Sequence, residues 1–237
     1  MKKIVILFIS LLASSQTQAQ TKTFNSLLQT HVDKNGNVDY KGLKADEVKL
    51  DSYINYLATT SPSKSWSANK QKAFWMNAYN AYTIKLILEN YPVKSIQKIS
   101  KKGKNAWKIP FVKVGGKIYT LDHIEHQILR KKLFDPRIHV GVNCASISCP
   151  KLHNKAFTEG NVHSELEKLM KSFINDSKRN KFGKKSMIHI SEIFNWFKND
   201  FTKKGSVIDY INKYATEKVD TNAQIHYLPY NWNLNGK

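Results

Sequence analysis

One segment, residues 67–90, restricts the possible folds of this chain more than any other. Ser67 is typical of a helix N-cap and Pro92 stands just beyond the far end, so the segment is predicted to be one long helix. Its interior, residues 74–84, is apolar or aromatic on nearly every side. A helix of this kind is buried around its whole circumference. The other elements must therefore pack around it.

Two amide side chains interrupt this apolar helix. Asn77 and Asn80 stand three residues apart and share one helix face. An amide on a packed face needs hydrogen-bond partners, because leaving it unsatisfied costs about 1–3 kcal/mol. The pair either ties down a neighbouring loop or lines a site, and the sequence leaves both interpretations open.

The remaining patterns mix helices and strands without a regular βαβ alternation, which indicates an α+β fold. Predicted helices lie near residues 24–32, 46–57, 122–132, 162–175, 191–201 and 207–214, and predicted strands near 111–114, 117–120, 138–142, 187–190 and 225–228. No repeat, linker or change in composition divides the 237 residues. We predict a single domain, residues 20–237, in which the buried central helix packs on a small, mainly antiparallel sheet.

The first nineteen residues have the pattern of a signal peptide. Lys2 and Lys3 form a basic start, an apolar run covers residues 4–13, and a polar stretch ends at Ala19. The apolar run is too short to span a bilayer. We expect cleavage after Ala19, a periplasmic or secreted protein, and no membrane span in the mature form.

The chain is strongly basic, with 38 Lys+Arg against 18 Asp+Glu and a net charge of +20. Only Arg130, Arg137 and Arg179 are arginines. Lysine is a solvated point charge without the planar fork that reads phosphates and base edges. We therefore expect no nucleic-acid partner, and the charge suits an exported protein among anionic envelope polymers, or simply reflects a lysine-rich composition. We also expect no cofactor, and a monomer.

Residues 135–150 hold the densest group of chemically useful side chains. A buried strand is predicted at 138–142, followed by a tight loop that ends at Pro150. The preceding helix contributes further polar side chains on one face. Among these, Glu125 has the spacing from Asp122 of a capping box, which would explain it without any function.

Several short runs resemble the motifs of one known family. They are Val38-Asp39-Tyr40, residues 74–81, residues 124–130, residues 135–139 and residues 144–150. Together they resemble the domain-of-unknown-function family 547, in an exported bacterial form, with a family core of about residues 24–214. This resemblance implies a fold and a set of notable positions. It implies no reaction.

Our first functional hypothesis is a polar cleft that binds an envelope peptide or glycan. The cleft lies between the 67–90 helix and residues 135–150. Its candidate residues are Asn77, Asn80, Glu125, His126, Arg130, Arg137, His139, Ser146 and Ser148. We predict in particular that His126, Arg130 and His139 converge there with the two asparagines.

A second hypothesis is a cysteine-dependent hydrolase or transferase, with Cys144 activated by His139 or His126. This chemistry requires the sulfur to lie within hydrogen-bond reach of the base. A buried helix followed by a histidine-bearing strand also resembles the papain and transglutaminase core, although those enzymes place the nucleophile at the start of the helix. No cysteine stands there in this chain.

Two further interpretations concern the same residues. His126 and His139 are of a type that binds metals, without a recognised ligand spacing. Cys144 and Cys149 are the two cysteines of the chain, and in an oxidising compartment they are expected to form a short-loop disulfide.

Overall fold

The computed structural model describes residues 19–184 and 186–237. The predicted signal peptide therefore lies outside the described residues, apart from Ala19, which is already helical. In the part of the chain that is described, no helix combines the length and apolar character needed to cross a membrane.

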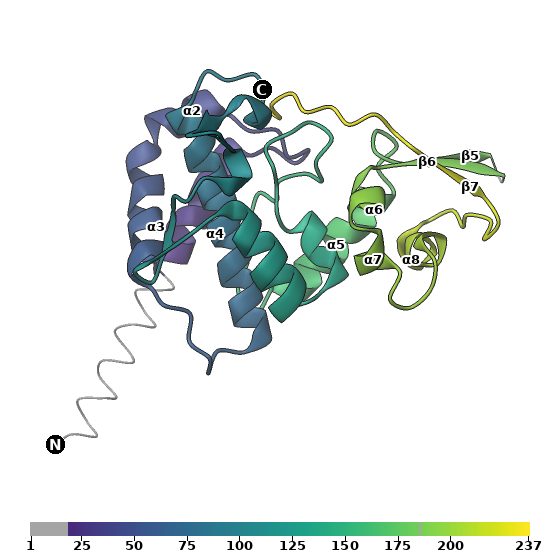
Figure 1. Ribbon diagram of the computed structural model, residues 1–237, viewed down its shortest axis with the longest axis horizontal. Helices are drawn as coiled ribbons and strands as arrows, with labels where there is room; N and C mark the ends of the chain where they lie inside the picture. Colours follow the sequence, from purple (N-terminus) through teal and green to yellow (C-terminus); the bar gives the residue numbers. More distant parts are fainter. Residues whose placement is uncertain (1–18, 185) are drawn as a thin grey trace.

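The predicted central helix is confirmed as α4 (Ala68–Glu89). The Ser67 side chain accepts the backbone N–H of Lys70, and the helix ends at its cap Asn90. Every residue from 73 to 84 is buried. The helices that pack against α4 include α3 (Glu47–Thr59), η3 (His123–Lys132) and α5 (Val162–Ile174). Figure 1 shows α3 and α5 beside it.

An N-terminal group of helices covers one side of this centre. A helix over residues 19–31 leads into a turn at 33–37 and then into α2 (Tyr40–Ala45). Asp33 shapes the turn by accepting the backbone N–H groups of Asn35 and Asn37. Gly36 supplies the positive φ of 82° that the turn requires.

The strands form three small sheets. The sheets are β1 (Ser100–Lys101) with β2 (Lys104–Asn105), β3 (Val112–Val114) with β4 (Lys117–Tyr119), and β5 (Lys181–Lys184) with β6 (Met187–Ile190) and β7 (Gln224–Tyr227). All pairs are antiparallel except β6 with β7, which is parallel. The α+β class is confirmed, and the strands are divided among three sheets where the sequence led us to expect one.

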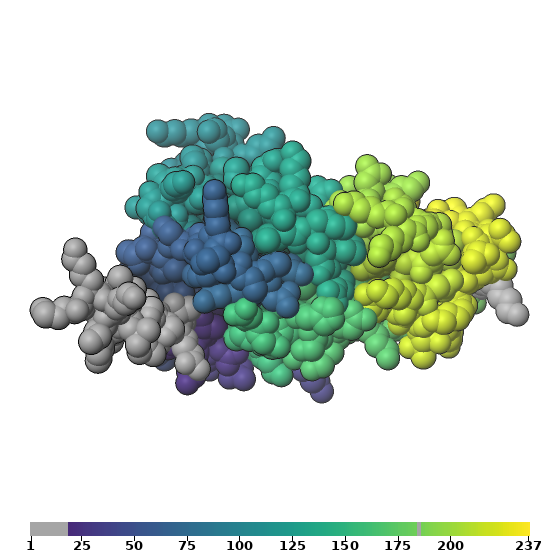
Figure 2. Space-filling model, turned by 90° about the horizontal axis from the view of Figure 1, so that it is seen from below, coloured from purple at the N-terminus to yellow at the C-terminus, as the bar shows by residue number. Residues whose placement is uncertain are grey.

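The third sheet and the last helices gather at one end of the molecule (Figures 1 and 2). These helices are α6 (Ile193–Trp196), α7 (Lys198–Phe201) and α8 (Val207–Tyr214). From β7 the tail runs back across the molecule, where Leu234 pairs with Ser146 and the N–H of Lys237 donates to the carbonyl of Val38. The tail thus contacts the loop that carries both cysteines.

Two predicted elements near the site are wrong. The strand expected at residues 138–142 is absent, because its first three residues belong to the short 3₁₀ helix η4 (Pro136–Val140). Pro136 occupies its first turn and the Asp135 side chain accepts the N–H of Arg137, which together favour a helix start. The helix expected at 191–201 is broken into α6 and α7 at Phe197. Two further 3₁₀ turns are η1 (Ile96–Lys98) and η2 (Ala106–Lys108).

The predicted helix near 122–132 exists, but η3 has π-helical geometry over His123–Lys132. Its start is capped by Thr120, whose hydroxyl accepts the N–H of His123 at 2.9 Å, whereas Asp122 makes no capping bond. The capping-box explanation of Glu125 is therefore wrong. Stretches of π-helix are rare and occur frequently at functional sites.

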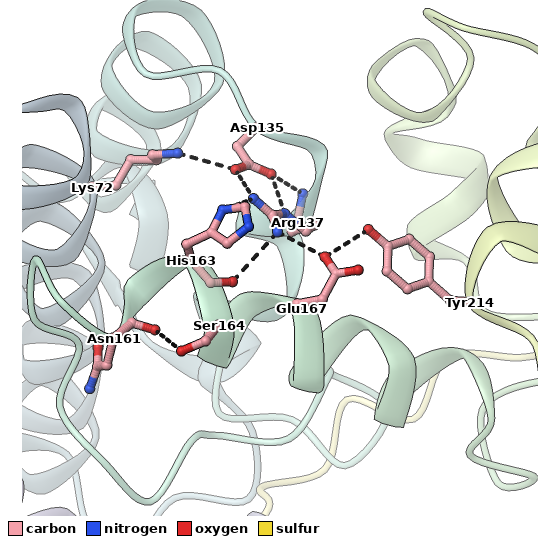
Figure 3. A network of polar contacts seen from close by, with 8 residues as sticks. All are labelled: Lys72, Asp135, Arg137, Asn161, His163, Ser164, Glu167 and Tyr214. Carbon is pink, nitrogen blue, oxygen red and sulfur yellow. Dashed lines mark hydrogen bonds and ion pairs between the residues drawn. The ribbon is translucent and has the colours of Figure 1, made fainter.

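A buried ion network ties η4 to the helices beside it (Figure 3). Arg137 forms two parallel hydrogen bonds to Asp135, from Nε at 2.9 Å and Nη2 at 2.8 Å, and a third to Glu167 at 2.8 Å. Lys72 of α4 also reaches Asp135, and the hydroxyl of Tyr214 donates to Glu167. Burial works against the charge of Asp135, but the bonds from Arg137 outweigh it and lower the pKa to about 2.

Candidate functional site

A cavity of about 270 Å³ lies where η3, the segment after η4 and the C-terminal tail meet. Polar side chains reach it from several elements, among them Glu125, His126, His139 and Cys144. These are residues that the sequence singled out, and the fold brings them to one cavity. A concave site with a few convergent polar groups among apolar walls is the usual form of a small-molecule site.

Aromatic rings form much of the wall. Trp196 stacks on Trp232 with ring centroids 5.7 Å apart, and Tyr230 lies 4.5 Å from Trp232. Trp107 meets Trp232 edge-on at 5.8 Å. Because Trp196 keeps 44% of its surface exposed, this cluster forms the rim as well as the wall.

Cys144 stands at a strained turn beside this cavity. The next residue, Ala145, has a φ of +58°, which is uncommon for a residue other than glycine. Asn143 holds the turn by accepting the N–H of Ala145 at 2.8 Å, and Asn80 in turn accepts the N–H of Asn143 at 2.9 Å. Such strain persists only where surrounding contacts fix it, and it is concentrated at functional sites.

Three neighbours surround the sulfur of Cys144. Its Sγ lies 3.1 Å from the Ser146 hydroxyl and 3.5 Å from the Tyr230 hydroxyl. A hydrogen bond with Cys149 is the largest influence on the Cys144 pKa. Together with the bonds from Ser146 and Tyr230, it outweighs burial and lowers that pKa to about 7. Burial and the nearby Cys144 raise the pKa of Cys149. Of the two thiols, Cys144 therefore has the lower pKa and ionises first.

The two cysteines are free thiols in the structure. The chain folds back between the two residues, as the expected disulfide would require, and the disulfide itself stays a prediction. The backbone N–H of Cys144 donates to the Cys149 sulfur at 3.2 Å. The loop is held by hydrogen bonds, including those that Arg179 donates to the carbonyls of Cys149 and Ile147.

Glu125 is a buried carboxyl on the cavity wall, with 8% of its surface exposed. Burial raises its pKa, against the opposing influence of His126 and of the hydrogen bond that the Tyr79 hydroxyl donates at 3.2 Å. Burial, followed by the charge of Glu125, also raises the pKa of Tyr79. A carboxyl whose neutral form is favoured can act as a proton donor.

A connected set of polar contacts holds the two histidines. Asp200 accepts hydrogen bonds from Arg130 Nε at 2.6 Å and from His139 Nε2 at 2.8 Å. Arg130 also lies 2.9 Å from His126 Nδ1, and because a guanidinium only donates, that nitrogen must accept. His126 therefore carries its proton on Nε2, which lies 3.6 Å from Asp122 Oδ1.

His139 is buried in the wall of the cavity, and burial favours its neutral form. Burial lowers its pKa, although the bond with Asp200 opposes this effect. The ring stacks on Phe197 at 4.0 Å. Its Nε2–H donates to Asp200, so His139 supports the wall of the cavity and is engaged with the carboxylate.

The structure corrects the expected pairing of Cys144 with a histidine. Within residues 19–184 and 186–237, its sulfur contacts Ser146, Tyr230 and Cys149, and neither His126 nor His139. The metal interpretation also finds no support, because the described residues contain no group of three or more histidine, cysteine, aspartate or glutamate side chains placed to hold an ion.

The predicted convergence of the asparagines with the histidines is wrong, because neither Asn77 nor Asn80 lines this cavity. Asn77 makes two hydrogen bonds with the backbone of Phe157, at 2.7 and 2.9 Å. Asn80 donates to the carbonyl of Gly141 at 2.9 Å and accepts from Asn143. Both amides tie down loops, which is the first of the two interpretations that the sequence left open.

The other candidates have supporting positions. Arg130 lies behind His126, and Arg137 belongs to the separate network of Figure 3. Ser146 contacts the Cys144 sulfur, whereas the hydroxyl of Ser148 accepts the N–H of Asn231 in the tail.

Sequence reasoning missed several residues of the site. These are Tyr79, Trp107, Trp196, Asp200, Tyr230 and Trp232. Tyr79 stands inside the run 74–81 that carried the family resemblance, beside Asn80. The tail shows no sequence pattern that would assign it to a site, and its hydrogen-bond partners lie more than 80 residues away in the chain.

Comparison with known proteins relates one segment of the chain to a family. Residues 63–174 match the model of the family described as "Protein of unknown function, DUF547". This segment, which contains α4, η3, η4 and the cysteine loop, belongs to that family. No curated protein and no solved structure matches the chain. Trp196, Asp200, Tyr230 and Trp232 stand outside the matched residues, so the segment alone does not complete the cavity.

Proposed function

We propose that this chain is a thiol-dependent acyl hydrolase or transferase with Cys144 as its nucleophile. One observation carries the proposal: Cys144, placed by a strained turn and with a lowered pKa, shares a cavity with Glu125, whose pKa is raised by burial. Opposite shifts of two titratable groups in one cavity are typical of a nucleophile and an acid.

The proposed reaction proceeds in two balanced steps. The Cys144 thiolate attacks the carbonyl carbon of an amide or ester, and the bond to the leaving group breaks as Glu125 gives that group its proton. A thioester on Cys144 results. Water or an acceptor amine then attacks the thioester, Glu125 recovers a proton from it, and the product leaves with Cys144 again a thiolate.

The other residues of the cavity position the reacting groups. The Nε2–H of His126 and the Tyr230 hydroxyl are donors at the cavity wall, and Arg130 with Asp200 fixes the orientation of the imidazole. The rings of Trp196 and Trp232 offer flat faces for substrate and exclude water from the thioester.

We propose further that the substrate is a peptide or glycopeptide of the cell envelope, because the first nineteen residues have the signal-peptide pattern. A net charge of +20 would favour encounter with anionic envelope material. The reduced state of both cysteines is the active one in this scheme, since a disulfide would consume the nucleophile.

The experiment that tests the proposal traps the thioester. Reduced protein, residues 20–237, is treated with S-phenyl thioacetate at pH 7 and mapped by peptide mass spectrometry. We expect acetylation of Cys144 in the parent and in Cys149→Ala, and none at this position in Cys144→Ser. In Glu125→Gln, acetylation should persist while release of the acyl group to water slows. Acetylation confined to lysines, or equal at both cysteines, would contradict the proposal.

A second candidate, a binding module without catalysis, is favoured by the aromatic rim alone. A glycan ring packs well on the exposed face of Trp196, which is the most accessible ring of the cluster. In this case tryptophan fluorescence should respond to envelope glycan fragments, and Trp196→Ala should abolish the response. Cys144→Ser should leave the glycan binding unchanged.

A further inference from the structure

A second cavity, of about 420 Å³, lies on the other side of the cysteine loop. Three segments enclose it: the turn at 34–37, residues 143–151, and the end of α5 with residues 175–179. Cys149 lines both this cavity and the aromatic one. The lining of this second cavity is polar, because lysine, asparagine and serine side chains stand where the first cavity has aromatic rings.

Three lysines give this cavity its charge. Lys34, Lys151 and Lys178 all line it, and none of them forms an ion pair with an acidic side chain in the described part of the chain. The carboxylate of Asp176 lies there too, but Arg179 neutralises it through a direct ion pair. The uncompensated charge facing the cavity is therefore positive.

The walls are fixed by specific backbone contacts. Gly36 packs so closely on the residue opposite that a side chain at this position would place its Cβ 2.4 Å from Lys151 Cβ and 2.8 Å from the backbone nitrogen of Leu152. Arg179 donates to the carbonyls of Ile147 and Cys149 at 3.0 and 2.9 Å. These contacts hold the turn and the loop in place around the lysines.

We propose that this cavity binds a phosphate group carried by a small molecule or a saccharide. Three lysines without an acidic partner among the described residues line this one hollow. Their combined positive charge suits a doubly charged oxyanion, and lysine is an established phosphate binder. The volume exceeds what one phosphate ion needs and is in the range of small-ligand sites. The site is separate from the aromatic cavity and does not depend on the thiol chemistry proposed above.

The test compares two charge-matched triple variants by thermal unfolding of the whole protein. Lys34→Gln/Lys151→Gln/Lys178→Gln removes the cavity lysines. The control Lys64→Gln/Lys98→Gln/Lys117→Gln removes three exposed lysines elsewhere. Inorganic phosphate and glucose 6-phosphate are titrated at constant ionic strength set with sodium chloride.

We expect a saturable rise in Tm for the parent and the control, and an apparent affinity at least tenfold weaker for the cavity variant. Tighter binding of glucose 6-phosphate than of inorganic phosphate identifies a phosphorylated saccharide as the ligand, and the reverse order identifies the free ion. A parent that responds to phosphate no more than to chloride, or two triple variants that lose the response equally, would overturn the proposal.

Discussion

Replacing Asp135 with asparagine tests the network that holds η4 beside the site. The carboxyl accepts two bonds from the Arg137 guanidinium and one from Lys72, and its side chain is only 9% exposed. Its pKa is about 2 in the folded protein, against an ordinary value of 3.8. At 1.36 kcal/mol per pH unit this difference corresponds to about 2 kcal/mol of stability.

The sign of the pH dependence follows from the lowered pKa. A carboxyl whose pKa is lower in the folded state stabilises the fold above the unfolded value and loses this contribution as the pH falls. For Asp135 the window runs from about pH 4 down to about pH 2. The asparagine retains an oxygen that can still accept the backbone N–H of Arg137, so the expected loss is mainly electrostatic.

Urea unfolding measures this effect directly. We expect Asp135→Asn to lower the free energy of unfolding by about 2 kcal/mol at pH 7 and by clearly less at pH 3. As a control, Asp220→Asn changes an exposed aspartate outside any ion pair of the described residues and should have an effect within about 0.5 kcal/mol. Equal stability of Asp135→Asn and the parent at pH 7, or an equal loss at both pH values, would refute the argument.

Three further substitutions separate structural from chemical roles. Asp200→Asn should cost about 3 kcal/mol in urea unfolding, because it leaves Arg130 without its buried carboxylate; an unchanged midpoint would contradict the network. Asn77→Ala should lower the free energy of unfolding by about 1–3 kcal/mol, because it leaves the backbone of Phe157 without its hydrogen-bond partners. The rate of Cys144 alkylation should stay unchanged, and slower alkylation would show that Asn77 contributes to the site. Glu125→Gln should leave the free energy of unfolding within about 1 kcal/mol of the parent's, because the raised pKa of Glu125 favours a neutral carboxyl, which a neutral amide resembles. A much larger loss would contradict the raised pKa.

Local sequence signals predicted the centre of the fold. The α4 helix has its cap at Ser67, its stop before Pro92 and an apolar interior, and all three signals act within the helix itself. The same holds for β6 and α8, which begin and end where their patterns predict. These elements depend little on distant partners for their type, so a single sequence was sufficient.

The errors arose where a short signal had two interpretations. The apolar run at 138–142 fits a strand or a buried helical turn equally well, and Asp135-Pro136 decided in favour of the turn. The spacing of Asp122 and Glu125 fits a capping box, but Thr120, two residues before Asp122, caps the helix. Glu125 is therefore not part of a cap, and it lines the cavity.

The sequence predicted only those residues of the site that lie in the segment matched by the family model. Glu125, His126, His139 and Cys144 were all named from the sequence, and they line one cavity. Other lining residues of this cavity come from the C-terminal tail and from α6. No local pattern connects Tyr230 with Cys144, because the contact depends on the path of the tail across the whole molecule.

The proposed chemistry depends on the ionisation of Cys144, which the ultraviolet absorbance of its thiolate reports. Native, reduced protein is titrated from pH 5 to pH 10 alongside Cys144→Ser and Cys149→Ala. We expect one thiolate that forms near pH 7 in the parent and is absent in Cys144→Ser. In Cys149→Ala it should form at higher pH, because the main stabilising hydrogen bond is lost. A parent whose first thiolate forms only above pH 8.5, or forms near pH 7 in Cys144→Ser as well, would contradict this expectation.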